Sequence, residues 1–424
     1  MIAIYRQEII QDIRLFTSQP AARFYDSLFL SLDLSFVQEY PHTGRRGFSS
    51  HSMICAFIVM KCEGFSMITD LVDYLNNNLL IAHYCGFDIT APLPSYWTFD
   101  RFLKNFDHSV LSNIMESQVL LLASQGIVDT SFIGLDSTPV AANTSQNNLK
   151  SFLPDRFKPD KQPNADRDCK LGVHTASNKL NEKNYAFYWG YKNHVLVDCI
   201  SGLPLYELTT TADIHDSSVA LDILASTHSF LPVTECTFLA DKGYDVKNIY
   251  HQVHSLYQGE CIIPLNKRNT KNPKLLPQGN PICEAGLAMW KDGTFSDNGR
   301  TRQKFCCPLK SSKHADCPCH HQNFYNGKRH RGCTKYMTLP DDLRLSIDRE
   351  SISFKKNYSL RTECERYNSR FKSTGQERMW VRNQTSVANL NTFAHISLLA
   401  VAVAVITTRS GQSYRKIKTV KRIA

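Results

Sequence analysis

Apolar residues recur with helical spacing through most of the first 125 residues of the chain. Two blocks show the period clearly: HSMICAFIVMKCEGFSMITDLVDYLNNNLLIAHYCG, from His51, and TFDRFLKNFDHSVLSNIMESQVLLLASQG, from Thr98. Side chains three and four positions apart share one face of a helix, so this spacing predicts amphipathic helices. Residues 1–125 are therefore expected to form a helical N-terminal region.

After Gly126 the pattern changes to short runs rich in β-branched and aromatic residues, which predict strands. A Ser201-Gly202 pair between two of these runs suits a hairpin turn. Helical spacing returns in 215–230 and 245–257, where Asp216 is expected to be the N-cap of the first helix. Hairpin-linked strands followed by alternating helices and strands predict an α/β fold with a mixed sheet. The expected strands are 131–138, 193–202, 203–210, 237–244 and 259–266.

The rest of the chain divides by composition and period. Residues 144–190 are polar and are expected to form a long loop or a partly ordered excursion. Residues 267–345 are loop-like and rich in Cys and His, as an insertion into the 126–266 core would be. Helical spacing from about residue 358 indicates that 346–408 completes the core with C-terminal helices. The apolar run Ile396–Thr407 covers about twelve residues against the roughly 20 that span a bilayer, so a buried helix is expected.

Composition narrows the function further. The 424 residues include 49 Lys and Arg against 39 Asp and Glu, a formal charge of +10, which favours a polyanionic partner without separating nucleic acid from a membrane surface. The N-terminal MIAIYRQEIIQDIRLF carries acids and no small-residue cleavage site, so a cytoplasmic location is expected. The tail 409–424 holds six basic side chains and no acid, and it either lies along DNA or is a disordered end.

The stretch YSLRTECERYNSRFK, residues 358–372, places two glutamates among basic side chains. On one continuous helix, Tyr358, Arg361, Glu365 and Lys372 fall within about 60° of one another, whereas Glu363 faces away. A carboxylate among fixed cations suits a site that binds a divalent metal ion and grips a phosphodiester. The alternative is a set of surface ion pairs along an exposed helix.

Further metal ligands are expected among acids that lie in apolar strands, where an unpaired charge is costly. Asp136 lies in FIGLDST and Asp241 ends the strand of TFLADKGYD, although an Asp at a strand end is also a common turn former or helix cap. Asp198 in VLVDCISG is expected to belong to a turn. Asp136, Asp241 and Glu365 can meet in an RNase H-like sheet beneath a late helix, and there they would hold two Mg²⁺ ions for an in-line displacement at phosphorus.

At these residues the chain resembles the bacterial insertion-sequence DDE transposases. The spacing Tyr358-x2-Arg361-x3-Glu365-x6-Lys372 matches their Y-R-E-K signature, and LDSTPV and LADKGYD resemble their first two acidic motifs. The resemblance implies that Asp136, Asp241 and Glu365 bind Mg²⁺, with Mn²⁺ as a substitute. It also implies that Tyr358, Arg361 and Lys372 contact DNA phosphate.

The same resemblance implies an RNase H-like core and an N-terminal region that helps to bind the terminal inverted repeats. It further implies a homodimer that cuts double-stranded DNA at transposon ends and joins the 3′-hydroxyl to target DNA. Two alternatives stay open. One is an inactive or domesticated DNA-binding protein, and the other is an RNase H-like nuclease without strand transfer.

The Cys/His-rich segment FCCPLKSSKHADCPCHHQNFYNGKRHRGC suggests a second metal. In a reducing compartment, thiolate and imidazole groups favour structural Zn²⁺ over a disulfide framework. The expected ligands are Cys306, Cys317, Cys319 and Cys333. The spacing is irregular, because Cys317 and Cys319 have one residue between them, so reduced thiols in a basic loop are the alternative.

Overall fold

The computed structural model describes most of the chain and divides it into two compact units. The first unit joins Met1–Val233 to Thr362–Ala424, and the second is Thr234–Arg361. The described residues are 17–39, 47–150, 154–177, 183–266, 276, 279–297, 300–310, 333–338, 343–408, 414–415 and 417.

In the described residues of the N-terminal part of the first unit there are six helices, and the predicted helical character of this region is observed. Ser49 caps α3, since its hydroxyl accepts a hydrogen bond from Ser52 N, and Gly64 ends the helix at a φ of 77°. α3 is buried on almost every side, which makes it the centre of this helical layer. The helices are α2 (Pro20–Leu30), α3 (Ser50–Glu63), α4 (Ile68–Asn77), α5 (Leu79–Tyr84), α6 (Tyr96–Asn105) and α7 (His108–Ser124).

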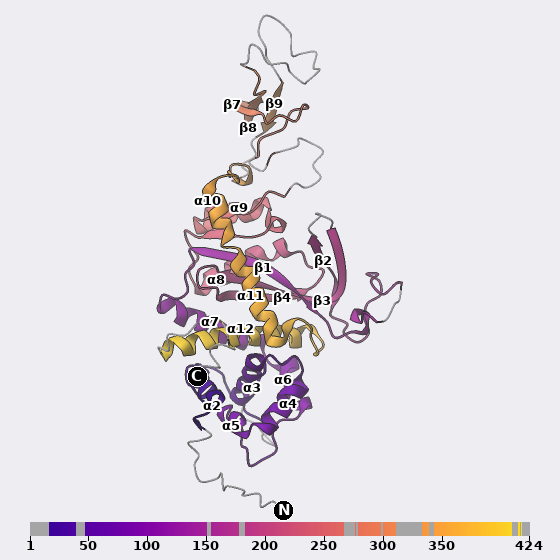
Figure 1. Ribbon diagram of the computed structural model, residues 1–424, viewed down its shortest axis with the longest axis vertical. Helices are drawn as coiled ribbons and strands as arrows, with labels where there is room; N and C mark the ends of the chain where they lie inside the picture. Colours follow the sequence, from indigo (N-terminus) through magenta and orange to yellow (C-terminus); the bar gives the residue numbers. More distant parts are fainter. Residues whose placement is uncertain are drawn as a thin grey trace, which may run out of the picture. The chain divides into compact units, whose positions relative to one another are not determined.

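The sheet of the first unit is antiparallel and is organised around one long strand (Figure 1). The first half of β3 (Lys183–Asp198) pairs with β2 (Lys170–Ser177). Its second half lies between β1 (Phe132–Ala141) and β4 (Pro204–Thr211), which pair with its two edges. The prediction of a loop over 144–190 is wrong where β2 and the first half of β3 lie. The apolar side chains Val173, Tyr185 and Phe187 are exposed there. Without a buried face, a strand has no regular alternation of apolar and polar residues that the sequence could show.

The turn between β3 and β4 forms where Ser201 and Gly202 predict it. Gly202 has a φ of 74° and donates its N–H to Asp198 O at 2.8 Å. Asp198 is buried and its carboxylate accepts hydrogen bonds from Ile200 N at 2.8 Å and Ser201 Oγ at 2.5 Å. Asp198 therefore belongs to the turn, as expected.

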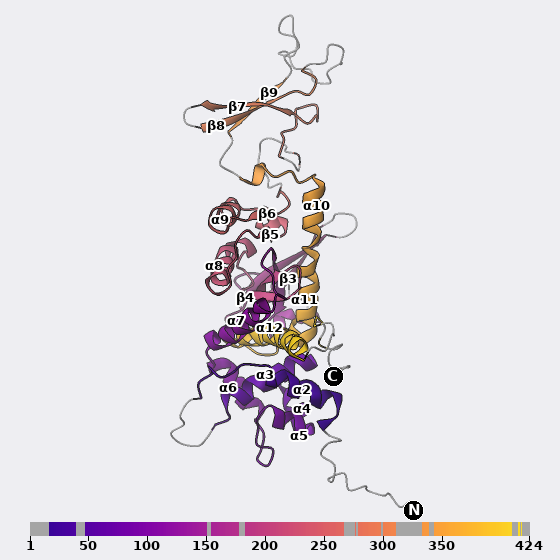
Figure 2. The same ribbon diagram turned by 90° about the vertical axis from the view of Figure 1, so that its left-hand side faces the viewer.

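α12 (Gln384–Thr407) lies between the N-terminal helices and the sheet of the first unit (Figures 1 and 2). It packs against α3, α7 and β4, and nearly all of its side chains are buried. Among the described residues it is the single helix that is long and apolar enough to cross a membrane, yet 89% of its most apolar window is buried inside the protein. The prediction of a buried helix is confirmed.

α8 (Ala220–Phe230) packs on β4, but its start differs from the prediction. Its N-cap position is Val219, with no side-chain cap, and Asp216 begins a separate 3₁₀ turn, Asp216–Ser218. Asp216 accepts a hydrogen bond from Lys192 Nζ at 2.9 Å instead. The Asp216 carboxylate is thus paired with Lys192 from β3, and Asp216 is not the N-cap of α8.

The second unit has a parallel pair of strands, β5 (Thr237–Leu239) and β6 (Glu260–Ile262), joined through α9 (Lys247–Tyr257). Its insertion contains an antiparallel sheet of β7 (Trp290–Asp297), β8 (Arg300–Cys306) and β9 (Thr334–Thr338). The prediction of a loop-like 267–345 is therefore wrong over these strands. Their hydrophobic core is small, formed by Cys283, Met289 and Phe305, which explains the weak pattern in the sequence.

The predicted fold class, an α/β protein with a mixed sheet flanked by helices, is confirmed. Three antiparallel strands, β1, β3 and β4, are followed by α8, β5, α9 and β6, and helices complete the chain. This order of elements is the one expected of an RNase H-like core.

Lys61 supplies a test of the packing in the first unit. The residue is 1% exposed in α3 and donates hydrogen bonds to Gln376 Oε1 at 3.3 Å and Phe65 O at 3.4 Å. Burial lowers the pKa of Lys61 to about 7, while in the unfolded chain the amine stays protonated to about pH 10.5. Between about pH 7 and pH 10.5 the Lys61 amine is therefore deprotonated in the folded protein and protonated in the unfolded chain. Because the unfolded state binds more protons, the free energy of unfolding rises with pH over this range.

We expect Lys61→Met to remove this dependence. In urea unfolding at pH 7 and pH 9, wild type should gain about 2–3 kcal/mol relative to Lys61→Met, since each pH unit is worth about 1.4 kcal/mol. Comparing the two proteins at each pH cancels the other titrating groups. Parallel pH profiles would mean that Lys61 keeps its ordinary pKa in the folded protein.

Candidate active site

Asp136 lies near the middle of β1 with its carboxylate half-buried. Ser137 N donates to its Oδ1 at 3.0 Å, and Asn368 Nδ2 donates to its Oδ2 at 3.1 Å. The second contact joins residues 232 positions apart. Asp136 is thus held at the place where α11 (Thr362–Phe371) packs on β1.

The two glutamates of α11 have different surroundings, as their angular separation predicts. Glu363 is 5% exposed and forms ion pairs with Arg366 at 3.0 Å and Arg370 at 3.1 Å. Arg370 Nη2 also donates to Gly202 O at 2.5 Å, which ties the helix to the β3–β4 turn. Glu365 is exposed and lies three residues before Asn368, on the same side of the helix. Glu363 is a structural carboxylate, and Glu365 is the one that faces solvent.

The single stripe expected over 358–372 is wrong, because the segment is not one helix. α10 (Ile352–Ser359) ends in a tightened turn, in which Leu360 N and Arg361 N donate to carbonyls three residues earlier. Tyr358 and Arg361 belong to the second unit, whereas Glu365 and Lys372 belong to the first. A common helix face can therefore be argued only for Glu365 and Lys372. Lys372 is the first residue of a short π-helical segment, Lys372–Gln376.

Asp241 lies in the second unit, directly after β5. Its Oδ1 accepts a hydrogen bond from Gly243 N at 2.7 Å, so it caps the 3₁₀ turn Lys242–Tyr244. The same loop is anchored by Asp245, which is fully buried and accepts from Tyr250 OH and Asn266 N, both at 2.9 Å. The capping alternative is thus observed for Asp241, and a cap with a half-buried carboxylate is compatible with a ligand role.

A buried polar network holds α11 in place, and its members are not recognisable from the sequence. Tyr367 OH lies 2.5 Å from His395 Nδ1, and His395 Nε2 lies 3.0 Å from Asn193 Oδ1. Asn193 Nδ2 donates to Glu207 Oε2 at 2.6 Å, and Thr392 Oγ1 donates to Glu207 Oε1 at 2.5 Å. These contacts run from the helix of Glu365 through α12 and β3 to β4.

The charges in this network set the direction of its hydrogen bonds. Burial lowers the pKa of His395 to about 4, so the imidazole is neutral near pH 7. Burial raises the pKa of Glu207, but the neighbouring His108 imidazole and the hydrogen bond from Thr392 outweigh it, and the pKa is lowered overall. With Glu207 as the final acceptor, Asn193 accepts from His395 Nε2, and His395 Nδ1 accepts from Tyr367 OH.

The chemistry of these groups fits a hard divalent cation. Asp136 and Glu365 are oxygen donors, and Asn368 Oδ1 is a buried oxygen with no hydrogen-bond partner. Within the described part of the chain, no three Asp, Glu, His or Cys side chains are close enough to form a metal site by themselves. Asp136 and Glu365 could thus form only part of a ligand set for such an ion.

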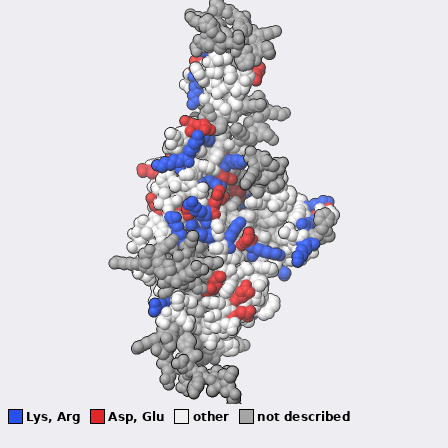
Figure 3. All heavy atoms as spheres, in the orientation of Figure 1, with Lys and Arg blue, Asp and Glu red and all other residues white. Residues whose placement is uncertain are grey.

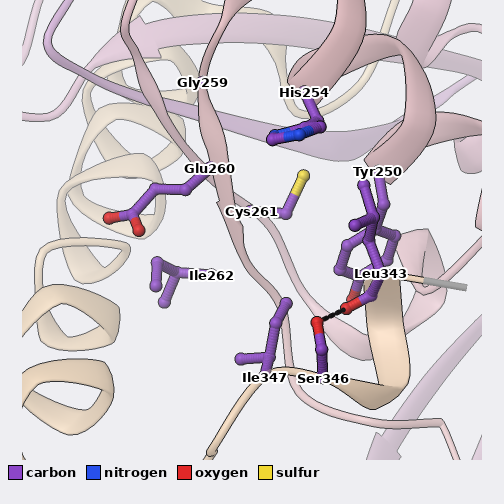
Figure 4. A pocket seen from close by; sticks show the side chains of 9 residues that line it. All are labelled: Tyr250, His254, Gly259, Glu260, Cys261, Ile262, Leu343, Ser346 and Ile347. Carbon is purple, nitrogen blue, oxygen red and sulfur yellow. Dashed lines mark hydrogen bonds between the residues drawn. The ribbon is translucent and has the colours of Figure 1, made fainter.

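Neither the pocket described in the second unit nor the charge on the face drawn in Figure 3 locates the site. Figure 4 shows a pocket of about 250 Å³ in the second unit, mostly apolar, near His254 and Cys261. None of the predicted catalytic residues lines it. On the face drawn in Figure 3, basic and acidic side chains lie interspersed over the described residues.

The zinc prediction receives no support from the two ligands that can be placed. Cys333 packs against the core cluster that contains Phe305. Cys306 follows Phe305 in β8, so its side chain points to the opposite face of the sheet. This separation disfavours one ion shared by Cys306 and Cys333. Cys317 and Cys319 lie outside the described residues, as does most of the basic tail.

In the first unit, a half-buried strand carboxylate thus lies beneath a helix that carries an exposed glutamate. The chain belongs to the DDE transposases: the family model described as "Transposase DDE domain" matches residues 128–400. A second model, "Transposase domain (DUF772)", matches residues 14–105. The protein is accordingly a DNA-processing enzyme of the transposase class.

No curated protein matches the chain significantly in sequence. Among solved structures, it is similar to the piggyBac transposase in a synaptic complex with hairpin DNA. The identity is 10%, the TM-score is 0.42, and the match covers 96% of this chain and 79% of that one. A likeness at this level supports no argument about the site.

Proposed function

We propose that the protein cuts double-stranded DNA at the ends of its own insertion sequence and joins the freed 3′-hydroxyl to target DNA. The observation that carries the proposal is the packing of α11 on β1, which brings the Asp136 carboxylate to the helix of Glu365 within the region matched by the DDE model. Asp136, Asp241 and Glu365 are proposed as the metal ligands.

The proposed cofactor is Mg²⁺, with Mn²⁺ as a substitute. When bound, the ions would activate the attacking oxygen and stabilise the leaving oxygen at phosphorus. Asp136 is already held by Ser137 N and Asn368, so its carboxylate is oriented before an ion binds. Glu365 is presented by a helix that the network from Tyr367 to Glu207 fixes in place.

Tyr358, Arg361 and Lys372 are proposed to contact phosphates near the transposon end. Arg and Lys neutralise phosphate charge, Arg through a planar fork and Lys as a point charge. The protein is proposed to act as a homodimer on paired ends in the cytoplasm. A non-catalytic DNA-binding descendant would have no need for an ordered Asp136, and the contacts to this carboxylate favour the active enzyme.

The proposal is tested with the full chain, Mg²⁺ and linear DNA that carries the element's own ends. Wild type is expected to release 3′-hydroxyl ends and to join them to a plasmid target, and EDTA is expected to stop both steps. Asp136→Ala should lower cleavage about a thousandfold or more, since a ligand that supports several kcal/mol of transition-state stabilisation is lost.

Two outcomes would contradict parts of the proposal. Cleavage that persists in Asp136→Ala would remove Asp136 from the mechanism. Cleavage without joined products, under conditions where a supplied 3′-hydroxyl end is available, would favour a nuclease that lacks strand transfer. Binding to the ends should remain in Asp136→Ala, which separates recognition from chemistry.

A further inference from the structure

Asn368 lies on α11 one helical turn after Glu365 and touches Asp136 directly. Its Nδ2 is 3.1 Å from Asp136 Oδ2, and the residue is 9% exposed. An ionised carboxylate accepts hydrogen bonds and donates none, so the amide must present Nδ2 to Asp136. The amide oxygen, Oδ1, therefore points away from the Asp136 carboxylate.

Asn368 Oδ1 is buried and has no hydrogen-bond partner among the described residues. A buried amide oxygen without a partner costs about 1–3 kcal/mol. Native proteins seldom retain such a group without a ligand, a water molecule or a catalytic reason. The same amide holds the Asp136 carboxylate, which is a candidate metal ligand, so a water molecule on a hydrated hard cation is a hydrogen-bond donor that fits this oxygen.

We propose that Asn368 is a positioning residue for the metal ion. Its Nδ2 holds the Asp136 carboxylate, and its Oδ1 accepts a hydrogen bond from a water molecule bound to the ion. The inference rests on the proposed function, because it takes Asp136 and Glu365 as ligands. Partners that orient metal ligands typically change metal affinity or activity about 10- to 100-fold when they are replaced.

The sequence gives Asn368 no distinguishing mark, since asparagine on a helix surface is common. The tertiary contact makes the assignment: Asn368 and Asp136 are 232 positions apart and meet because α11 lies on β1. The residue also shares its helix face with Glu365, three positions earlier. Asn368 therefore contacts one candidate ligand of the first unit and shares a helix face with the other.

The test measures Mn²⁺ binding to the full chain without DNA, from the electron paramagnetic resonance signal of free Mn²⁺. The proteins are wild type, Asn368→Ala, Asn368→Leu and the control Ser369→Ala, an exposed neighbour on α11. Asn368→Leu keeps the volume of the side chain and so guards against collapse of the α11–β1 contact. The Kd for Mn²⁺ is expected to rise about tenfold or more in both Asn368 variants and to stay unchanged in Ser369→Ala.

A kinetic measurement distinguishes positioning from mere packing. In the Mg²⁺ cleavage assay, kcat should fall about 10- to 100-fold in the Asn368 variants while KM for the DNA ends stays the same. A purely structural role would lower the melting temperature and leave the Mn²⁺ Kd and the kcat of the folded protein at wild-type values. That result would overturn the inference.

The failure of this inference differs from the failure of the proposed function. If wild type binds Mn²⁺ and cuts DNA, and the Asn368 variants do both equally well, the inference alone is wrong. If wild type neither binds Mn²⁺ nor cuts its own ends, the proposed function is wrong and the role of Asn368 falls with it.

Discussion

Glu365→Gln is expected to lower DNA cleavage about a thousandfold or more with little change in stability. Glu365 is exposed on α11, so replacing its carboxylate by an amide removes a metal ligand without disturbing the core. The loss corresponds to several kcal/mol of transition-state stabilisation. The measurement is single-turnover cleavage of the element's ends in Mg²⁺, together with the melting temperature of each protein.

Glu363→Gln is the matched control, and the opposite pattern is expected. Glu363 is 5% exposed and paired with Arg366 and Arg370, and breaking a buried ion pair costs about 3–5 kcal/mol. Cleavage per folded molecule should stay within a few fold of wild type. If Glu363→Gln abolishes cleavage in the folded protein while Glu365→Gln does not, the roles of the two glutamates are reversed.

Glu207→Gln is expected to lower the stability of the protein by about 2–4 kcal/mol near pH 7. Glu207 is buried and accepts hydrogen bonds from Asn193, Thr392 and Thr209. A glutamine has one acceptor oxygen and directs its NH₂ group toward other donors, so buried groups lose partners. Denaturant unfolding of the two proteins measures the difference.

The pH dependence of this difference gives a second check. The folded pKa of Glu207 is lowered from 4.5, so the stability contributed by its charge is full above pH 4.5 and is lost as pH falls below it. The deficit of Glu207→Gln should therefore shrink in acid. Glu350→Gln, at an exposed pair with Lys355, should change stability by less than about 0.5 kcal/mol. A deficit that is independent of pH would show that the charge of Glu207 contributes nothing.

The main elements of the fold could be predicted wherever burial imposes a period. The N-terminal helices, α12, the strands β1 and β4 and the second half of β3 each have a buried face or are buried on all sides, so their apolar spacing is visible. β2 and the sheet β7–β9 were missed, because their exposed side chains and small core leave no regular pattern. The N-cap role of Asp216 failed because Lys192 competes for its carboxylate.

The candidate site was predictable only in part. Spacing and local context single out Asp136, Asp241 and Glu365, and the helical period separates Glu365 from Glu363. The period also suggested one continuous stripe from Tyr358 to Lys372, and this was wrong because two helices meet at Leu360 and Arg361. A local pattern gives the angle between side chains only as long as the helix continues.

The sequence by itself determined the local features of this protein: its helices and principal strands, the Asp198 turn and the acidic motifs of a transposase. The tertiary structure decided which side chains support those motifs. Asn368 meets Asp136, and Tyr367 joins Glu207 through His395 and Asn193, across long separations in the chain. Periodicity reports the face on which a residue lies, whereas hydrogen-bond partners depend on how distant elements pack.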